Sequence, residues 1–392
     1  MNLADLTEDE QAILGAVSRF VEERVRGEIL RLEQAGEYPQ ALVDEMKALG
    51  LFGLAVPEAF GGLGLRTTVF AAVMEVLARG WTTLAAYVNS HSTVAHAIST
   101  YGTAEQKDRF LPGLASGEHR GSLCLTEPGA GSDLQSIRGT ARPDGDGYAL
   151  TASKTYVTNG AKATVMLVLA RHPSVADQKP HFSLFLVEKA SPGVSVTTTF
   201  HKTGFDLVDT VQIEMDAVRL SPDALLGAVE GKGFPQLMEA LEIGRIAIAA
   251  SAVGLAANAL SEAKRYAAER VAFGVTIDRH QGVQFRLADM ATRLVSARLI
   301  TREAARVKES GGRCDMISAM AKMQASDEAL AIAHAAVVVH GGAGYIRDYT
   351  VERLHREALL YTIGEGTNDI NRLVIARRMK GEGEMAYLGL LP

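Results

Sequence analysis

The 392-residue sequence has almost no cysteine and no long apolar run. Its two cysteines, Cys124 and Cys314, lie far apart and form no CxxC pair, which argues against a disulfide framework and a structural zinc site. We therefore expect no metal. No uninterrupted apolar stretch approaches the ~20 residues that cross a bilayer, so we also expect no membrane span. Residues 1–8 are acidic and lack the features of an export signal, which predicts a cytoplasmic location.

The sequence also lacks an excess of positive charge. It has 40 Lys and Arg against 46 Asp and Glu, a formal net charge of −6, and its basic residues are scattered along the chain. This pattern disfavours nucleic acid as a partner. The 47% hydrophobic and 22% charged residues are typical of a globular protein, and the length leaves room for two or three structural units.

Helical patterns occupy both ends of the chain. Residues 1–120 are predicted to form an N-terminal helical domain, which opens with a capping box at Thr7 and Glu10. Residues 231–392 are predicted to form a C-terminal helical domain. Within it, residues 246–260 are apolar or alanine on every face, as in a fully buried helix.

A β pattern fills the middle of the chain, residues 121–230. Asp144-Gly145-Asp146-Gly147 predicts a hairpin, and short strand-like segments follow at close spacing. These segments are 148–151, 164–170, 182–187, 194–198 and 211–215. We expect a small β-barrel or sandwich here, and the fold class is therefore α+β and multi-domain.

A turn near the C-terminus holds the most suggestive acidic residue. Glu365 lies between two helix-patterned runs, and Gly364 and Gly366 free the backbone on either side of it. The next helix begins near Thr367, so its first amide groups are available to bind a carbonyl or phosphate oxygen. Taken alone, however, Gly-Glu-Gly-Thr is more often only a helix C-cap followed by an N-cap.

Two segments of the β region have further candidate residues. Residues 126–133 are rich in glycine and hydroxyl groups without forming a Walker loop, so they suit either a tight turn or a rigid lip against a planar cofactor or acyl chain. Residues 154–160 place Tyr156 and Thr158 on one face of a strand, where they offer a ring platform and a hydroxyl donor. Taken alone, this second pattern is more often core packing.

Together these segments resemble the acyl-CoA dehydrogenase family, from about residue 5 to residue 380. The resemblance rests on residues 56–65, 125–133, 154–160, 269–274, 280–281, 341–345 and 365–367. It implies an N-terminal helical domain, a central β domain and a C-terminal four-helix bundle, with FAD between the β domain and the bundle.

The resemblance implies that Glu365 is the catalytic base. It would remove the α-proton of an acyl thioester while the β-hydrogen leaves as hydride to flavin N5, giving a trans-2-enoyl thioester. A closed apolar pocket is expected to raise the pKa of this carboxylate. A second family pattern places the base directly before the arginine that corresponds to Arg245. That position is Gly244 here, so Glu365 is expected to be the sole base.

The resemblance also implies two binding sites. FAD contacts are expected from Leu125, Thr126, Tyr156, Thr158, Arg270, Phe273, Gln281, Gly341, Gly342 and Thr367. Substrate contacts are expected from Ser132, Glu242, Arg245, Gly364 and Gly366. Arg270, Phe273 and Gln281 match positions that reach the FAD of a neighbouring subunit, which predicts a homo-oligomer, usually a tetramer. An electron-transfer flavoprotein is the expected electron acceptor.

Several alternatives stay open at this point. A flavin oxidase or monooxygenase of the same fold would use O₂, and a non-catalytic scaffold would keep only the fold. The thioester carrier is either CoA or an acyl carrier protein. Gly364 replaces a tyrosine found in many members, which predicts room for α-branched acyl groups. The absence of Lys and Arg from residues 81–101 predicts that dicarboxylic acyl groups are poor substrates.

Overall fold

The fold of the chain comes from a computed structural model, which describes residues 6–172, 181–381, 383 and 387–388. Its N-terminal part is helical, as predicted. The helices are α1 (Glu8–Phe20), continued by the π-helical turn η2 (Val21–Val25), α2 (Ile29–Ala35), α3 (Gln40–Ala48), α4 (Thr67–Gly80), α5 (Thr82–Tyr101) and α6 (Ala104–Ser116). The capping box is confirmed, because Thr7 Oγ1 accepts from the Glu10 amide and Glu10 Oε2 accepts from the Thr7 amide.

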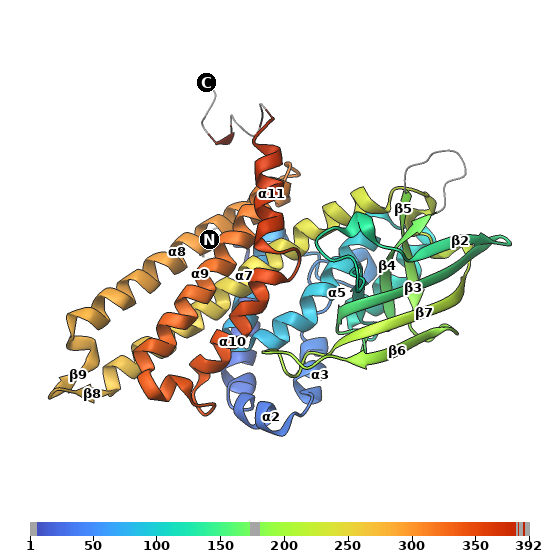
Figure 1. The fold of residues 1–392 in the computed structure, drawn as a ribbon. Helices are drawn as coiled ribbons and strands as arrows, with labels where there is room; N and C mark the ends of the chain where they lie inside the picture. Colours follow the sequence, from blue (N-terminus) through green and yellow to red (C-terminus); the bar gives the residue numbers. More distant parts are fainter. Residues whose placement is uncertain (1–5, 173–180, 382, 384–386, 389–392) are drawn as a thin grey trace.

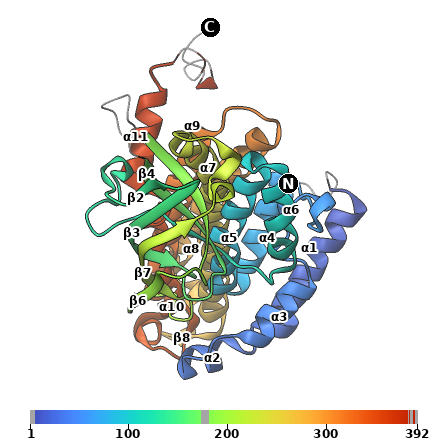
Figure 2. The same cartoon turned by 90° about the vertical axis from the view of Figure 1, so that its right-hand side faces the viewer.

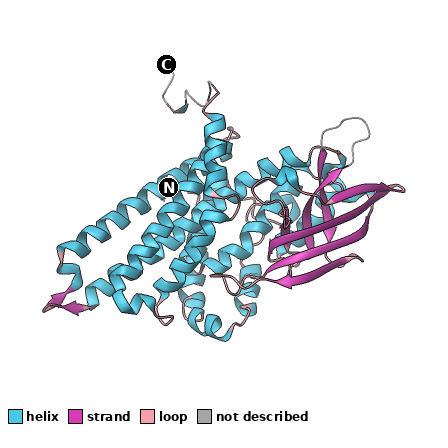
Figure 3. Ribbon diagram, in the orientation of Figure 1, coloured by secondary structure: helices cyan, strands magenta, loops and turns pink. Residues whose placement is uncertain are grey.

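The middle of the chain forms one mixed sheet. Its strands are β1 (Gly121–Cys124), β2 (Thr140–Asp144), β3 (Gly147–Thr158), β4 (Val165–His172), β5 (His181–Glu188), β6 (Val194–Thr199) and β7 (Thr210–Leu220). Their order is β1-β4-β2-β3-β7-β6, with β5 paired to β4. The predicted hairpin is confirmed by the pairing of Asp144 with Gly147. The expected barrel or sandwich is thus a single curled sheet on one side of the molecule (Figure 3).

The C-terminal part is a set of long helices packed side by side (Figure 1). They are α7 (Gly233–Glu269), α8 (Gln281–Glu309), α9 (Asp315–His340), α10 (Thr350–Ile363) and α11 (Asn368–Arg378). Two short strands, β8 (Val271–Ala272) and β9 (Val275–Thr276), form a tip between α7 and α8, at the end of the bundle away from the sheet (Figure 1). Asp315 is the first residue of α9, and its carboxylate accepts from the Met316 amide.

The helix α7 lies at the centre of the fold. It is long and apolar enough to cross a membrane by length and composition, but 89% of its most apolar window is buried inside the protein. This degree of burial is that of a core helix and agrees with the apolar pattern of residues 246–260. The helices α4 and α9 cover much of its surface.

The helix α5 joins the three parts of the chain (Figures 1 and 2). On the sheet side, Asn159 Nδ2 donates to the Ala86 carbonyl at 3.0 Å, and the Tyr87 hydroxyl donates to the Leu207 carbonyl at 2.7 Å. On the bundle side, Thr82 Oγ1 donates to Glu357 Oε2 of α10 at 2.5 Å. These buried bonds fix the position of α5 relative to both neighbours.

Close packing of α7 on α4 depends on Gly254. A Cβ atom at this position would lie 2.3 Å from the Glu75 carbonyl oxygen and 2.8 Å from the Arg79 amide nitrogen. Both contacts are with backbone, which cannot move aside as a flexible side chain can. The two helices therefore approach each other at a distance that only glycine permits.

We expect Gly254→Ala to lower the free energy of unfolding by about 1–3 kcal/mol, because the added methyl group forces α4 and α7 apart. The matched control is Gly15→Ala in α1, where the added Cβ would meet only the flexible end of Arg19 at 3.6 Å. Helix propensity predicts a gain of up to about 1 kcal/mol for that variant. Urea unfolding followed by circular dichroism compares the two, and equal stability would contradict the packing argument.

Candidate active site

The turn between α10 and α11 has an unusual backbone. Glu365 has φ 53°, a left-handed conformation rare for a residue other than glycine, and Gly366 follows with φ 86°. Thr367 caps α11, because its side chain accepts from the Ile370 amide at 3.2 Å. In the described part of the chain, the amides of Glu365, Gly366 and Thr367 donate to no protein group. The turn thus offers unpaired donors beside a carboxylate.

The Glu365 carboxylate contacts two helices of the core. Asn89 Nδ2, on α5, donates to Glu365 Oε1 at 2.8 Å. On α7, a Cβ atom at Gly244 would lie only 1.9 Å from Glu365 Oε2, so the carboxylate fits because this residue has no side chain. Glu365 Oε2 is buried and has no hydrogen-bond partner within the described residues. Oε1 is therefore held by a hydrogen bond, whereas Oε2 has no hydrogen-bond partner in the described chain.

Burial raises the pKa of Glu365 to about 7, and this matches the expectation from sequence. The hydrogen bond from Asn89 and the charges of Arg245 and Lys322 oppose the effect of burial. Lys322, on α9, donates to the Gly366 carbonyl at 2.8 Å and to Asn368 Oδ1 at 2.9 Å. It thereby ties the turn to α9 without a hydrogen bond to Glu365 itself.

The two predicted substrate residues on α7 differ in their surroundings. Glu242 accepts from Lys308 Nζ at 2.8 Å, and Lys308 also contacts Glu239, so this acid belongs to an ion-pair network between α7 and α8. Arg245 is buried, and its Nε has no hydrogen-bond partner in the residues that the structure describes. The charge of Arg245 lowers the pKa of Glu365 and so opposes the effect of burial.

On the sheet side, the structure brings four predicted cofactor residues together: Leu125, Thr126, Tyr156 and Thr158. The Thr126 carbonyl accepts from the Thr155 amide at 2.9 Å, and the Leu125 carbonyl accepts from Lys154 Nζ at 3.0 Å. These bonds hold the loop after β1 against the end of β3. Lys154 is itself buried and paired with Glu127 at 2.9 Å, which makes this attachment rigid.

Tyr156 presents an open aromatic surface at this place. Its backbone has φ 56° within a bulge of β3, and the residue is 64% exposed. Its ring lies 5.1 Å from that of Phe200, between centroids. An exposed ring on a rigid strand end suits a planar ligand.

Thr367 lies in the Glu365 turn, and the remaining predicted site residues lie elsewhere. Arg270, Phe273 and Gln281 are at the bundle tip, where Phe273 is 96% exposed. Gly341 and Gly342 follow the end of α9. Ser132 is exposed in the loop after β1. A single chain therefore brings together only part of the set predicted from sequence.

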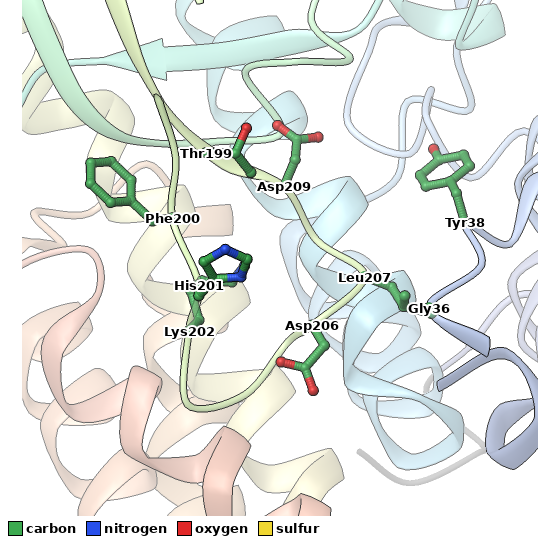
Figure 4. A pocket seen from close by; sticks show the side chains of 9 residues that line it. All are labelled: Gly36, Tyr38, Thr199, Phe200, His201, Lys202, Asp206, Leu207 and Asp209. Atoms are coloured by element: carbon green, nitrogen blue, oxygen red, sulfur yellow. The ribbon is translucent and has the colours of Figure 1, made fainter. Parts of the chain in front are cut away.

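Two cavities are lined by other residues, although Phe200, which lines the first, packs against Tyr156. One of about 450 Å³ is formed by the loop between β6 and β7 and the linker before α3, with Tyr38, His201, Lys202 and Asp209 around it (Figure 4). The other, of about 330 Å³, is lined by five arginines and five acidic residues among others. None of the predicted site residues lines either cavity.

Sequence reasoning missed Asn89 and Lys322, which both act on the Glu365 turn. Lys322 is a charged residue in a largely apolar stretch of α9, and that exception is the signal that could have found it. Asn89 begins the polar run Asn-Ser-His-Ser-Thr of α5, so no such signal marks it. Sequence reasoning also missed Glu357, whose pKa burial raises to about 7. Glu357 accepts from Thr82 and faces Arg353 at 3.8 Å, so it links α5 to α10.

Comparison with known proteins identifies the family. The N-terminal, middle and C-terminal domains of acyl-CoA dehydrogenase match residues 7–118, 122–218 and 231–380. The chain belongs to the acyl-CoA dehydrogenase family. This confirms the resemblance and the fold class predicted from sequence.

Individual relatives span nearly the whole chain. An acyl-CoA dehydrogenase of Bacillus subtilis is 38% identical over 378 residues, which cover 96% of this chain and 99% of the relative. The caffeyl-CoA reductase-Etf complex subunit CarC of Acetobacterium woodii is 35% identical over 372 residues, 94% of this chain and 98% of the relative. The structure of butyryl-CoA dehydrogenase from Megasphaera elsdenii matches with a TM-score of 0.91 at 33% identity, covering 96% and 99%.

This acyl-CoA dehydrogenase homologue is an oxidoreductase of an FAD-dependent family, and FAD is its cofactor. Its residues fit that group. The exposed Tyr156 ring and the neighbouring loop at Thr126 offer a platform with polar edges, and unpaired amides and a free carboxylate oxygen lie at Glu365. These features suit a flavin ring on one side and a thioester on the other.

Removal of the Glu365 charge should stabilise the protein in a defined pH range. The pKa of Glu365 is about 7 in the folded protein, against a reference value of 4.5 that we take for the unfolded chain. As the pH rises above 4.5, ionisation of Glu365 therefore favours the unfolded chain and lowers the free energy of unfolding, and this loss is complete above pH 7. We expect Glu365→Gln to be more stable than the wild type by up to about 3 kcal/mol at pH 8 and equal to it near pH 4.5.

Urea unfolding of both proteins at matched pH measures this difference, and the titration of Glu357 cancels in the comparison. A stability difference that does not change between pH 4.5 and 8 would show that the Glu365 carboxylate is not desolvated.

Proposed function

We propose that the enzyme removes two hydrogens from the α and β carbons of an acyl thioester, with Glu365 as the base that takes the α-proton. The observation that supports this most directly is the buried Glu365 carboxylate, with Oε2 free and unpaired backbone amides beside it. The product is a trans-2-enoyl thioester. When bound, FAD accepts the β-hydrogen as hydride at its N5 atom.

The protein groups of the turn support proton removal in two ways. Backbone amides that donate to the thioester carbonyl oxygen stabilise the enolate character that develops as the α-proton leaves. A carboxylate with a pKa near 7 is a stronger base than one in water, yet it is still ionised in a large fraction of molecules at neutral pH. Both features come from the same few residues, because the amides and the carboxylate belong to one turn.

Glu365 is proposed as the sole base. Gly244 occupies the alternative family position, and an added side chain there would collide with Glu365 Oε2. Glu242 is the nearest other acid on that helix, and its ion pair with Lys308 at 2.8 Å makes it a weaker candidate. Retention of Glu365 also favours dehydrogenation over a same-fold oxidase, a monooxygenase or a non-catalytic scaffold.

The assembly, the partners and the location are part of the proposal. Arg270, Phe273 and Gln281 lie at the exposed bundle tip, so we propose that they complete the FAD site of a second subunit in a homo-oligomer, with a tetramer as the expected form. A relative belongs to a reductase-Etf complex, which supports an electron-transfer flavoprotein as acceptor. We propose CoA rather than an acyl carrier protein as the thioester carrier, and the cytoplasm as the location.

The proposal is tested by anaerobic titration of the FAD-loaded enzyme with a panel of acyl-CoA thioesters, followed by flavin bleaching. The wild type should bleach with at least one straight or branched acyl-CoA. Glu365→Gln should keep its FAD and lose bleaching by at least about a hundredfold in rate, because no base remains. Glu242→Gln tests the other candidate base. It should still bleach with saturating acyl-CoA, whereas full loss in that variant would move the base to α7.

The acyl specificity is tested at Gly364. This residue has an ordinary backbone, with φ −71° and ψ 151°, and an added Cβ would meet the Leu360 carbonyl oxygen at an acceptable 3.4 Å. Gly364→Tyr should therefore fold, place a ring beside the reacting carbons and reduce kcat/KM for α-methyl acyl-CoA by about tenfold or more relative to straight acyl-CoA. If the wild type strongly prefers straight acyl chains and Gly364→Tyr leaves that preference unchanged, the proposal that Gly364 leaves room for α-branched acyl groups is contradicted.

The same comparison includes an ω-carboxyl acyl-CoA. The helix α5 carries no Lys or Arg, and Lys308 is already paired with two glutamates. We therefore propose that kcat/KM is low for this substrate. A kcat/KM equal to that of the matched monocarboxylic acyl-CoA would contradict the proposal that dicarboxylic acyl groups are poor substrates.

A further inference from the structure

Asn89 is the hydrogen-bond partner of the Glu365 carboxylate. Its Nδ2 donates to Glu365 Oε1 at 2.8 Å, and no other hydrogen bond to this side chain occurs among the described residues. The charged groups that face Glu365 are Arg245 from α7 and Lys322 from α9, and both act on it without a hydrogen bond. One neutral amide therefore fixes the direction of the carboxylate.

The atoms around this hydrogen bond give it a defined orientation. Asn89 Oδ1 and Glu365 Oε2 are both buried and both lack a partner within the described chain. If the amide rotated by half a turn, Oδ1 would face an ionised carboxylate, and two acceptors would oppose each other. The ionised base thus selects the orientation in which Nδ2 donates, and this leaves Oε2 as the oxygen available for a proton.

The position of Asn89 is set by the sheet as well as by its own helix. One turn before it, the Ala86 carbonyl accepts from Asn159 Nδ2, and the Tyr87 hydroxyl donates to Leu207. Asn159 directly follows Thr158, at the strand end where the predicted flavin contacts gather. The helix that carries the partner of the base is therefore bonded to the strand end that faces the cofactor.

We propose that Asn89 is the positioning residue of this active site. It holds Glu365 by Oε1, which leaves Oε2 without a protein partner, and it keeps the base at a fixed place relative to the flavin side of the sheet. This role rests on the proposed function of Glu365. Asn89 itself does not exchange a proton with the substrate.

The test replaces Asn89 by leucine, which is similar in size and cannot donate a hydrogen bond. With the FAD-loaded enzyme and its best acyl-CoA substrate, Asn89→Leu should lower kcat by about ten- to a hundredfold, because the base is no longer held in line. KM should change less than threefold. The pH at which kcat/KM reaches half its plateau should rise, since loss of a donor to the ionised carboxylate makes it harder to deprotonate.

Ser92→Ala is the matched control. Ser92 is also buried on α5, less than one turn beyond Asn89, and its hydroxyl makes no hydrogen bond in the described chain. This variant should leave kcat and the pH profile unchanged. Asn89→Asp should move the pH profile further than Asn89→Leu, because it places a second negative charge beside the base.

A readout without turnover is the stability difference between Asn89→Leu and the double variant Asn89→Leu/Glu365→Gln as a function of pH. The pH at which this stability difference reaches half its full size should be higher than the corresponding pH for the wild type and Glu365→Gln. An unchanged kcat and pH profile in Asn89→Leu would overturn the proposal, as would an equal effect of Ser92→Ala. Retained activity in Glu365→Gln would instead refute the proposed function itself.

Discussion

The arrangement of this active site depends on taking one carboxylate out of water. Burial makes Glu365 a stronger base, and three core helices make that burial possible. One supplies a single hydrogen-bond donor at Asn89, one supplies space at Gly244, and one supplies Lys322, which secures the turn. None of these three groups forms an ion pair with the carboxylate at hydrogen-bond distance, so its basicity is retained.

The same constraint explains why the domains are joined as they are. In the proposed reaction the base and the flavin stand on opposite sides of one substrate, and the residues proposed for these two roles belong to different parts of the chain. The helix α5 contacts both parts, through Asn89 on the bundle side and through Ala86 and Tyr87 on the sheet side. Because these bonds lie on one helix, movement of the sheet against the bundle would disturb the position of Glu365.

Local signals predicted much of this structure from sequence. Caps and periodicity located the helices, and alternating residues with glycine turns located most strands. The complementarity of Gly244 and Glu365 was predicted from a family pattern, and in the structure the two residues lie in direct contact. The short strands β1 and β2 were not predicted as strands, because β1 has only four residues and β2 contains a proline and two charged residues.

What the sequence did not reveal is mostly long-range contact. Asn89 lies 276 positions before Glu365, and nothing in its local pattern indicates which residue it meets. The contact between Gly244 and Glu365 has a consequence for engineering the site. A side chain added at Gly244 would take the space that the Glu365 carboxylate now fills, so the carboxylate would have to turn away from α7. The direction of the carboxylate is therefore set by two helices at once, by the amide of Asn89 and by the missing side chain at Gly244.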